Sequence, residues 1–182
     1  MTIRGMRIIA GSRKGHRIEA PKGHDTRPTS DRVREAAFML AGPVDGANVL
    51  DLFAGSGAMG LEALSRGAER ATFVEGDPRA AAVIQKNLDK LRLTGARIVR
   101  ADATRALAAE AAAGAKYDLV LVDPPYDSYE SLQPMLARYL PTLLAEEGLV
   151  LVETSERVSP ELPLELFKSR TYGSVRVSVF GA

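Results

Sequence analysis

The apolar run Leu-Val-Leu-Val occurs twice in this chain, at residues 119–122 and 149–152. Strands that are apolar on both faces are typical of a parallel sheet that helices cover on both sides. The chain after residue 47 fits such a sheet, because segments with a strand pattern alternate with segments with a helical pattern. We predict strands at 48–53, 71–77, 96–102, 117–123 and 148–154, and helices at 59–67, 78–93, 103–113 and 131–144, the last kinked or split at Pro134.

The two ends of the chain depart from this alternation. The last two extended segments have no helix between them, which predicts a C-terminal antiparallel hairpin at the sheet edge and about seven strands in total. Near the N-terminus, residues 6–21 are typical of a β-hairpin, and Thr29, Ser30 or Asp31 is placed to cap a following helix. The expected fold is therefore a Rossmann-like α/β fold, with an N-terminal extension at 1–34 and a larger domain at 35–182.

The composition excludes several kinds of chemistry. The chain has no cysteine, so disulfides, cysteine zinc sites and thiolate nucleophiles are excluded. No stretch has the length and apolarity of a membrane span, and the N-terminus lacks the apolar core of a signal peptide. We therefore expect a cytoplasmic protein without a metal cofactor and without a membrane partner, and we expect it to be a monomer.

The charge is distributed unevenly. The net charge is +1, but residues 1–34 contain nine Lys or Arg against three acids. A basic extension on a mildly acidic body favours a polyanionic partner such as nucleic acid, although a solvated basic surface without any partner fits about as well. Arg32 and Arg34 are two residues apart and cannot share one helix face, so one of them is expected to pair with Asp31 or Glu35. The candidate contacts to such a nucleic acid are Arg7, Arg13, Lys14, Arg17, Arg27, Arg32 and Arg34.

A glycine-rich loop follows the first predicted strand of the alternating region. In VLDLFAGSGAMG, glycines allow a tight turn and close approach of a ligand, and Glu75 comes about 20 residues after Gly55, where an acid can accept hydrogen bonds from ribose hydroxyls. The spacing also matches dinucleotide-binding loops. However, Asp51 would repel a pyrophosphate and would suit a cation, which favours S-adenosylmethionine (SAM). Asp102 is placed either to meet the adenine edge or to cap the next helix, or to do both. The candidate cofactor residues are Asp51, Phe53, Ala54, Gly55, Ser56, Gly57, Gly60, Glu75, Gly76, Asp102 and Ala103.

The segment Asp-Pro-Pro-Tyr at 123–126 follows the fourth predicted strand. Proline has no N–H, so the Asp123 carboxylate and the Pro124 carbonyl form a stiff group of acceptors. Their natural partner is an amino group, whose lone pair they can aim at a methyl donor, and Tyr126 offers a face on which an extruded base can stack. A strand-ending turn with a surface tyrosine is the alternative. The candidate catalytic residues are Asp123, Pro124, Pro125 and Tyr126.

Several of these motifs together resemble one family. The stretches MRIIAGSRKGHRI, TRPTSDRVREAAF, VLDLFAGSGAMGLEALSRGA and VLVDPPY are similar to those of the RsmD family, bacterial class I SAM-dependent methyltransferases that modify guanine N2 in small-subunit ribosomal RNA. The resemblance implies that the glycine loop and Glu75 hold SAM, with S-adenosylhomocysteine (SAH) as product. It implies that residues 123–126 hold the guanine. It also implies a 16S rRNA partner, within an assembled small subunit, contacted by the N-terminal hairpin.

Other functions fit part of the pattern. An amino-methyltransferase acting on adenine N6 of DNA or RNA, or on a protein glutamine, would use the same acceptors, the Asp123 carboxylate and the Pro124 carbonyl, which together form an acceptor clamp. A nicotinamide-dependent oxidoreductase could share the fold, but no histidine follows His24 to serve it. A third alternative is an RNA-binding module that has lost its activity, against which the intact Asp-Pro-Pro-Tyr segment argues.

Overall fold

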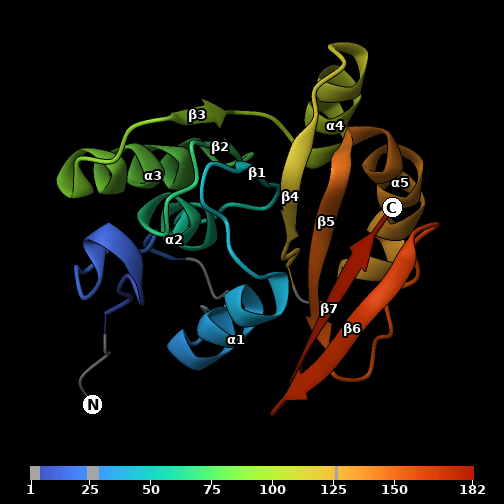
Figure 1. Ribbon diagram of the computed structural model, residues 1–182. Coiled ribbons are helices and arrows are strands. Elements are labelled where there is room, and N and C mark those ends of the chain that lie inside the picture. The colour runs from blue at the N-terminus through green and yellow to red at the C-terminus, as the bar shows by residue number, and fades with distance from the viewer. Residues whose placement is uncertain (1–4, 24–28, 126) are drawn as a thin grey trace.

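The computed structural model describes residues 5–23, 29–125 and 127–182, which form a seven-stranded sheet with helices on both faces (Figure 1). The strand order is β3-β2-β1-β4-β5-β7-β6. The strands are β1 (Asn48–Asp51), β2 (Arg70–Val74), β3 (Ala96–Val99), β4 (Tyr117–Val122), β5 (Leu144–Ser155), β6 (Glu165–Tyr172) and β7 (Val175–Gly181). The helices are η1 (Gly11–Arg13, a 3-10 helix), α1 (Asp31–Ala41), α2 (Ala58–Ser65), α3 (Pro78–Leu91), α4 (Ala103–Ala112) and α5 (Tyr129–Leu143).

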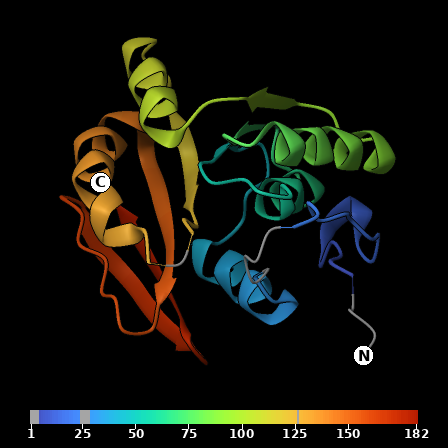
Figure 2. The same cartoon turned by 180° about the vertical axis from the view of Figure 1, so that it is seen from behind.

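The apolar strand runs are buried on both faces, as predicted. In β4, Leu119 and Leu121 pack into a core formed with α1, α2 and α3, whereas Val120 and Val122 pack into a second core formed with α4 and α5. Successive side chains of a strand point to opposite faces, so an uninterrupted apolar run supplies both cores at once. Figures 1 and 2 show the helices on the two sides of the central strands.

The C-terminal hairpin is confirmed, and the structure gives its order. β7 lies between β5 and β6 and is antiparallel to both, so β6 is the edge strand. The five strands before them are mutually parallel. α5 runs as one helix through Pro134 and Pro141, so of the kink or split predicted at Pro134, the split does not occur. Burial of one helix face compensates for the lost backbone hydrogen bonds, and that face consists of Leu136, Leu140 and Leu143.

The N-terminal segment pairs with itself, but less regularly than two strands would. Arg7 and Arg17 form an antiparallel bridge around η1, and the described part of this segment contains no named strand. Ile8 and Ile18 are buried in the core that includes α2 and α3, so the segment packs on the sheet layer (Figures 1 and 2). A Cβ at Gly11 would lie 1.8 Å from the Ser65 carbonyl oxygen, so this close approach requires glycine.

Ser30 is the residue that caps α1, one of the three that the sequence offered, since its side chain accepts from the Val33 N–H. Within the described ranges, no helix has the length and apolarity needed to cross a membrane.

Candidate active site

The parallel strands place the candidate residues at one edge of the sheet. β1 lies between β2 and β4 in the sheet. The strand order reverses here, because β2 and β3 are added on one side of β1 and β4 and β5 on the other. Ligands in such sheets bind outside the carboxyl ends of the strands at this reversal point. The glycine loop follows β1, Glu75 follows β2 and Asp123 follows β4. The structure therefore brings the predicted cofactor residues and the predicted acceptors to the same edge of the sheet.

The glycine loop has the backbone conformation that its residues predict. Gly55 and Gly57 have φ angles of 55° and 83°, and Gly57 begins α2 from a left-handed conformation. Gly60 has a different reason to lack a side chain, because a Cβ there would lie 2.3 Å from the Phe73 ring. The loop thus turns tightly after β1, and α2 packs closely against β2.

Asp51 is buried beneath this loop. Its carboxylate is 2% exposed and accepts a hydrogen bond from the Gly60 N–H at 2.9 Å. Burial raises the pKa of Asp51 to about 7; the hydrogen bond from Gly60 opposes this rise, and the charges of Asp123 and Glu75 add to it. A buried carboxyl group with one backbone donor is well suited to a cationic ligand, such as the ammonium of SAM, and poorly suited to a pyrophosphate.

Glu75 joins the loops after β1 and β2. Its Oε2 accepts from the Gly55 N–H at 2.7 Å and its Oε1 from the Asp77 N–H at 2.9 Å. Each carboxylate oxygen has two lone pairs, so both remain able to accept from ribose hydroxyls. The donors and acceptors present at this site therefore fit SAM.

The remaining cofactor candidates line the neighbouring loops. Asp102 caps α4 by accepting from the Arg105 N–H at 3.1 Å, which confirms one of the two roles predicted for it, and Ala103 begins that helix. Gly76 is exposed beside Asp102, and Phe53 is partly exposed in the loop after β1. Ala54 is buried, and the Ser56 carbonyl accepts from the Asn87 side chain at 3.1 Å.

Asp123 is held by a residue from far away in the sequence. Its Oδ2 accepts from the Thr29 hydroxyl at 3.0 Å, and the same hydroxyl lies 3.3 Å from both carboxylate oxygens of Glu153. Pro124 and Pro125 follow Asp123, and the Pro125 carbonyl accepts from the Ser128 N–H at 3.1 Å, which closes a turn. Tyr126, predicted to stack on a base, lies outside the described residues.

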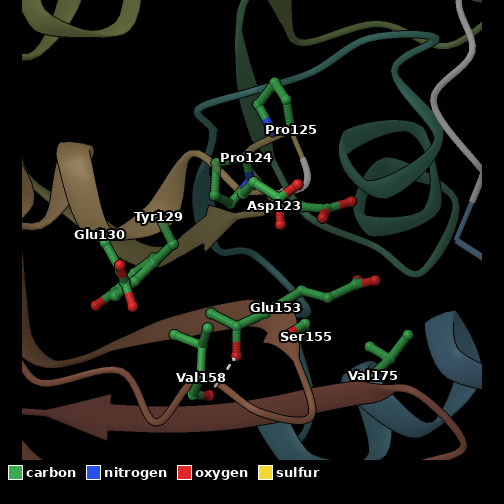
Figure 3. A pocket seen from close by; sticks show the side chains of 11 residues that line it. Asp123, Pro124, Pro125, Tyr129, Glu130, Glu153, Ser155, Val158 and Val175 are labelled. Atoms are coloured by element: carbon green, nitrogen blue, oxygen red, sulfur yellow. Dashed lines mark hydrogen bonds between the residues drawn. The ribbon is translucent and has the colours of Figure 1, made fainter.

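A pocket of about 180 Å³ lies against this group of acceptors (Figure 3). Asp123 and Glu153 line it together with Tyr129 and Glu130 from the start of α5. Its volume is far larger than one water molecule needs. The charged side chains among its described lining residues are all acidic, so the pocket favours groups that donate hydrogen bonds.

The two carboxyl groups affect each other's ionisation. Burial raises the pKa of Asp123 to about 6, against the opposing hydrogen bond from Thr29. Burial and the charge of Asp123 raise the pKa of Glu153 to about 8. Two carboxylates at one hydroxyl repel each other, so the pair retains a proton near neutral pH.

The sequence interpretation overlooked Thr29 and Glu153, although one signal was available. Asp123 follows the first Leu-Val-Leu-Val run and Glu153 follows the second. Val122 and Val152 are register partners of the parallel strands β4 and β5, so the next residue of each strand reaches the same place. Matching strand ends could therefore have indicated a pair of acids.

The candidate RNA contacts differ in their accessibility. Lys14, Arg17 and Arg32 are exposed. Arg7 is exposed beside Asp31, its Nε 2.8 Å from the carboxylate. Arg13 is partly buried and donates to the carbonyl groups at the end of α3. Arg27 lies outside the described residues.

Arg34 is fully buried, unlike a residue that contacts phosphate. Its Nη2 donates to the Arg7 carbonyl and to Asp31, so the predicted pairing of one helix arginine with Asp31 is confirmed for Arg34. Its Nε also lies 3.7 Å from the buried Glu62 carboxylate. Charge counting could not reveal this, because the buried acid beside Arg34 lies in a different helix, α2.

Glu62 connects the N-terminal segment to the sheet layer. Its carboxylate is fully buried and accepts from the backbone N–H groups of Ile9 at 2.9 Å and Ala10 at 3.0 Å, and from Arg66 Nε at 2.9 Å. With Arg34, this network holds the N-terminal segment, α1 and α2 together.

Comparison with known proteins places the chain in a family. The model of the family described as Conserved hypothetical protein 95 matches residues 6–181. The chain belongs to this family. Its members include the RsmD methyltransferases, so the chain is a class I SAM-dependent methyltransferase of the RsmD family, as its motifs indicated.

Relatives of known sequence and structure cover nearly the whole chain. YlbH of Bacillus subtilis (strain 168) is 40% identical over 184 residues, covering 96% of this chain and 98% of the relative. Ribosomal RNA small subunit methyltransferase D of Escherichia coli (strain K12) is 37% identical over 184 residues, covering 96% and 89%. The structure of a hypothetical protein from Thermus thermophilus superposes with a TM-score of 0.83 at 31% identity, covering 97% and 99%.

Within the described residues, no group of three or more His, Asp or Glu side chains is placed to hold a metal ion.

Proposed function

We propose that this RsmD-family protein transfers a methyl group from SAM to the exocyclic N2 amine of a guanine in 16S rRNA, within the assembled small ribosomal subunit. We propose that it acts as a monomer in the cytoplasm, where that substrate lies. Residues 35–182 would carry the methyltransferase site and residues 1–34 would contact the RNA. The Escherichia coli relative named ribosomal RNA small subunit methyltransferase D supports ribosomal RNA as the substrate class.

One observation supports the amine chemistry above the others. Asp123 lies at the carboxyl end of β4, beside the β1 loop and in an acidic pocket whose described lining has no cationic side chain. Its carboxylate and the Pro124 carbonyl can accept both hydrogens of an amino group. An aromatic amine is a weak nucleophile because its lone pair is delocalised, and two acceptors that hold its hydrogens can turn that lone pair toward the methyl group.

Each group of the site has a part in this reaction. Asp51 would pair with the cationic part of SAM, and Glu75 would accept from its ribose hydroxyls. SAM supplies a methyl group on a positively charged sulfur. The Asp123 carboxylate would hold the target amine and take up the proton that it releases. The exposed Lys14, Arg17 and Arg32 would contact RNA phosphates.

The test is methyl transfer from labelled SAM to small ribosomal subunits that lack the modification, with naked 16S rRNA, DNA and bulk protein in parallel. Digestion of the product should place the label in N2-methylguanosine. Label in N6-methyladenine or in protein glutamine would favour the alternative substrates instead. Asp123→Ala should abolish transfer while calorimetry still detects SAM binding. Full activity of this variant would refute the clamp.

A further inference from the structure

The clamp includes a second carboxyl group that the proposed reaction does not yet use. Glu153 is 8% exposed at the end of β5, one strand away from Asp123, and the Thr29 hydroxyl lies between the two. Both carboxyl groups line the same pocket (Figure 3). A buried acid that has no cationic partner in that pocket is costly to keep unless it serves the site.

The number of available hydrogens and the distances between the three groups favour one bonding arrangement. A threonine hydroxyl has one hydrogen to donate and lone pairs to accept with. The shorter distance, 3.0 Å, is to Asp123 Oδ2, and both oxygens of Glu153 lie at 3.3 Å. If both acids were ionised, one of them would face the hydroxyl oxygen without a hydrogen between them. A proton on Glu153 resolves this, because Glu153 then donates to Thr29 and Thr29 donates to Asp123.

The surroundings favour the same arrangement. The other charged residues in the described pocket lining, Asp127 and Glu130, are acidic, and so is Asp51, whose charge interacts with that of Asp123. On the other side of Glu153, its partner in β7 is Val177, which is apolar and buried. Burial raises the pKa of Glu153 to about 8, in agreement with a protonated side chain at neutral pH.

We propose that Glu153 acts in its protonated form as a positioning residue, donating through the Thr29 hydroxyl to Asp123 and thereby fixing the Asp123 carboxylate toward the target amine. The second oxygen of Asp123 and its remaining lone pairs then stay available to the amine. This inference rests on the proposed amine methylation. In that reaction, formation of the nitrogen–carbon bond accompanies cleavage of the methyl–sulfur bond, whose electron pair stays on sulfur, and the surplus proton passes from nitrogen to the ionised Asp123.

The experiment compares variants that keep or remove the donor. The Gln side chain of Glu153→Gln can still donate to Thr29, whereas Glu153→Met fills similar space without donating. We expect kcat to fall at least about tenfold more in Glu153→Met than in Glu153→Gln, because misorientation of a reacting group lowers the rate of the chemical step. KM for SAM should change little in either variant. Thr29→Val should behave like Glu153→Met, and Thr29→Ser should restore most of kcat. Glu146→Gln, on the exposed opposite end of β5, is the matched control and should equal the wild type.

The pH profile distinguishes this role from a merely structural one. Wild-type kcat should decline as Glu153 ionises near pH 8, and Glu153→Gln should lack that decline. Identical profiles, or full activity of Glu153→Met, would overturn the proposal. Infrared spectroscopy tests it without any substrate. The wild-type spectrum minus that of Glu153→Gln should contain a protonated-carboxyl band at pH 7 that is lost above pH 8, since the protonated fraction of Asp51 contributes to both spectra. An unchanged band in that variant refutes the role of Glu153, whereas transfer to a different amine refutes only the proposed substrate.

Discussion

Asp51 should couple SAM binding to proton release. Its buried carboxyl group has a pKa of about 7, so roughly a tenth of it is ionised at pH 6 and half at pH 7. If the ionised form pairs with the ammonium of SAM, the association constant rises about fivefold over this interval, and binding releases about 0.9 proton at pH 6 and about 0.5 at pH 7. The interval ends at pH 7 because an ordinary α-amino group, such as that of SAM, itself loses its proton near about pH 8.

Calorimetry in two buffers of different ionisation enthalpy measures both quantities in one series. Asp51→Asn is the matched variant, because its amide oxygen can still accept from the Gly60 N–H and its size is nearly the same. We expect the variant to bind SAM more weakly, with the same affinity at pH 6 and pH 7 and without proton release. A wild-type affinity that does not change with pH, or a pH dependence that survives in Asp51→Asn, would refute the pairing of Asp51 with the cofactor.

Three further outcomes follow from the structure. Glu62→Ala should lower the free energy of unfolding in urea by about 3–5 kcal/mol, because it removes the buried acid beside the buried charge of Arg34. The control Glu69→Ala should change it little, because the ion pair of Glu69 is exposed. Replacing both Lys14 and Arg17 by Ala should reduce the slope of log affinity for the RNA against log salt by about 2, and an unchanged slope would move the RNA surface elsewhere. The pKa of Glu153 is raised from 4.5 to about 8 in the folded state, so its contribution to stability is present below pH 4.5 and is lost as the pH rises to 8. In chemical denaturation, the free energy of unfolding of Glu153→Gln should therefore increase relative to that of the wild type by a few kcal/mol between pH 4.5 and pH 8. A difference that stays constant with pH would contradict this prediction.

The fold was predictable because its signal is local and repeated. Solid apolar runs at 119–122 and 149–152 can be buried only between two helical layers, and the structure places alternate residues of β4 in two cores. The boundaries were less certain. β5 begins at Leu144, earlier than its apolar run, and α5 continues through Pro134, because packing of the helix face outweighs the local penalty.

The site was predictable only where its residues lie in contiguous motifs. The residues of the glycine loop and Asp123 belong to such motifs, and the structure places them at the carboxyl ends of the neighbouring strands β1 and β4. Thr29 and Glu153 contact each other across 124 positions of sequence, so no local pattern relates them. Arg34 was predicted to be an accessible RNA contact, but it is buried beside Glu62, which lies in another helix. Long-range contacts of this kind depend on the packed structure.

The N-terminal segment has two roles in the structure that a deletion experiment would confuse. Its exposed Lys14 and Arg17 are candidates for RNA contact, but its buried Ile8 is part of the core, and Thr29 donates a hydrogen bond to Asp123. Removing residues 1–34 would therefore expose apolar surface and remove the hydrogen bond from Thr29 to Asp123, in addition to removing the proposed RNA contacts. Loss of activity on truncation would not identify the segment as an RNA-binding element. Point substitutions separate the roles, because replacing the exposed cations is expected to change RNA affinity and its salt dependence, whereas replacing Thr29 is expected to change kcat.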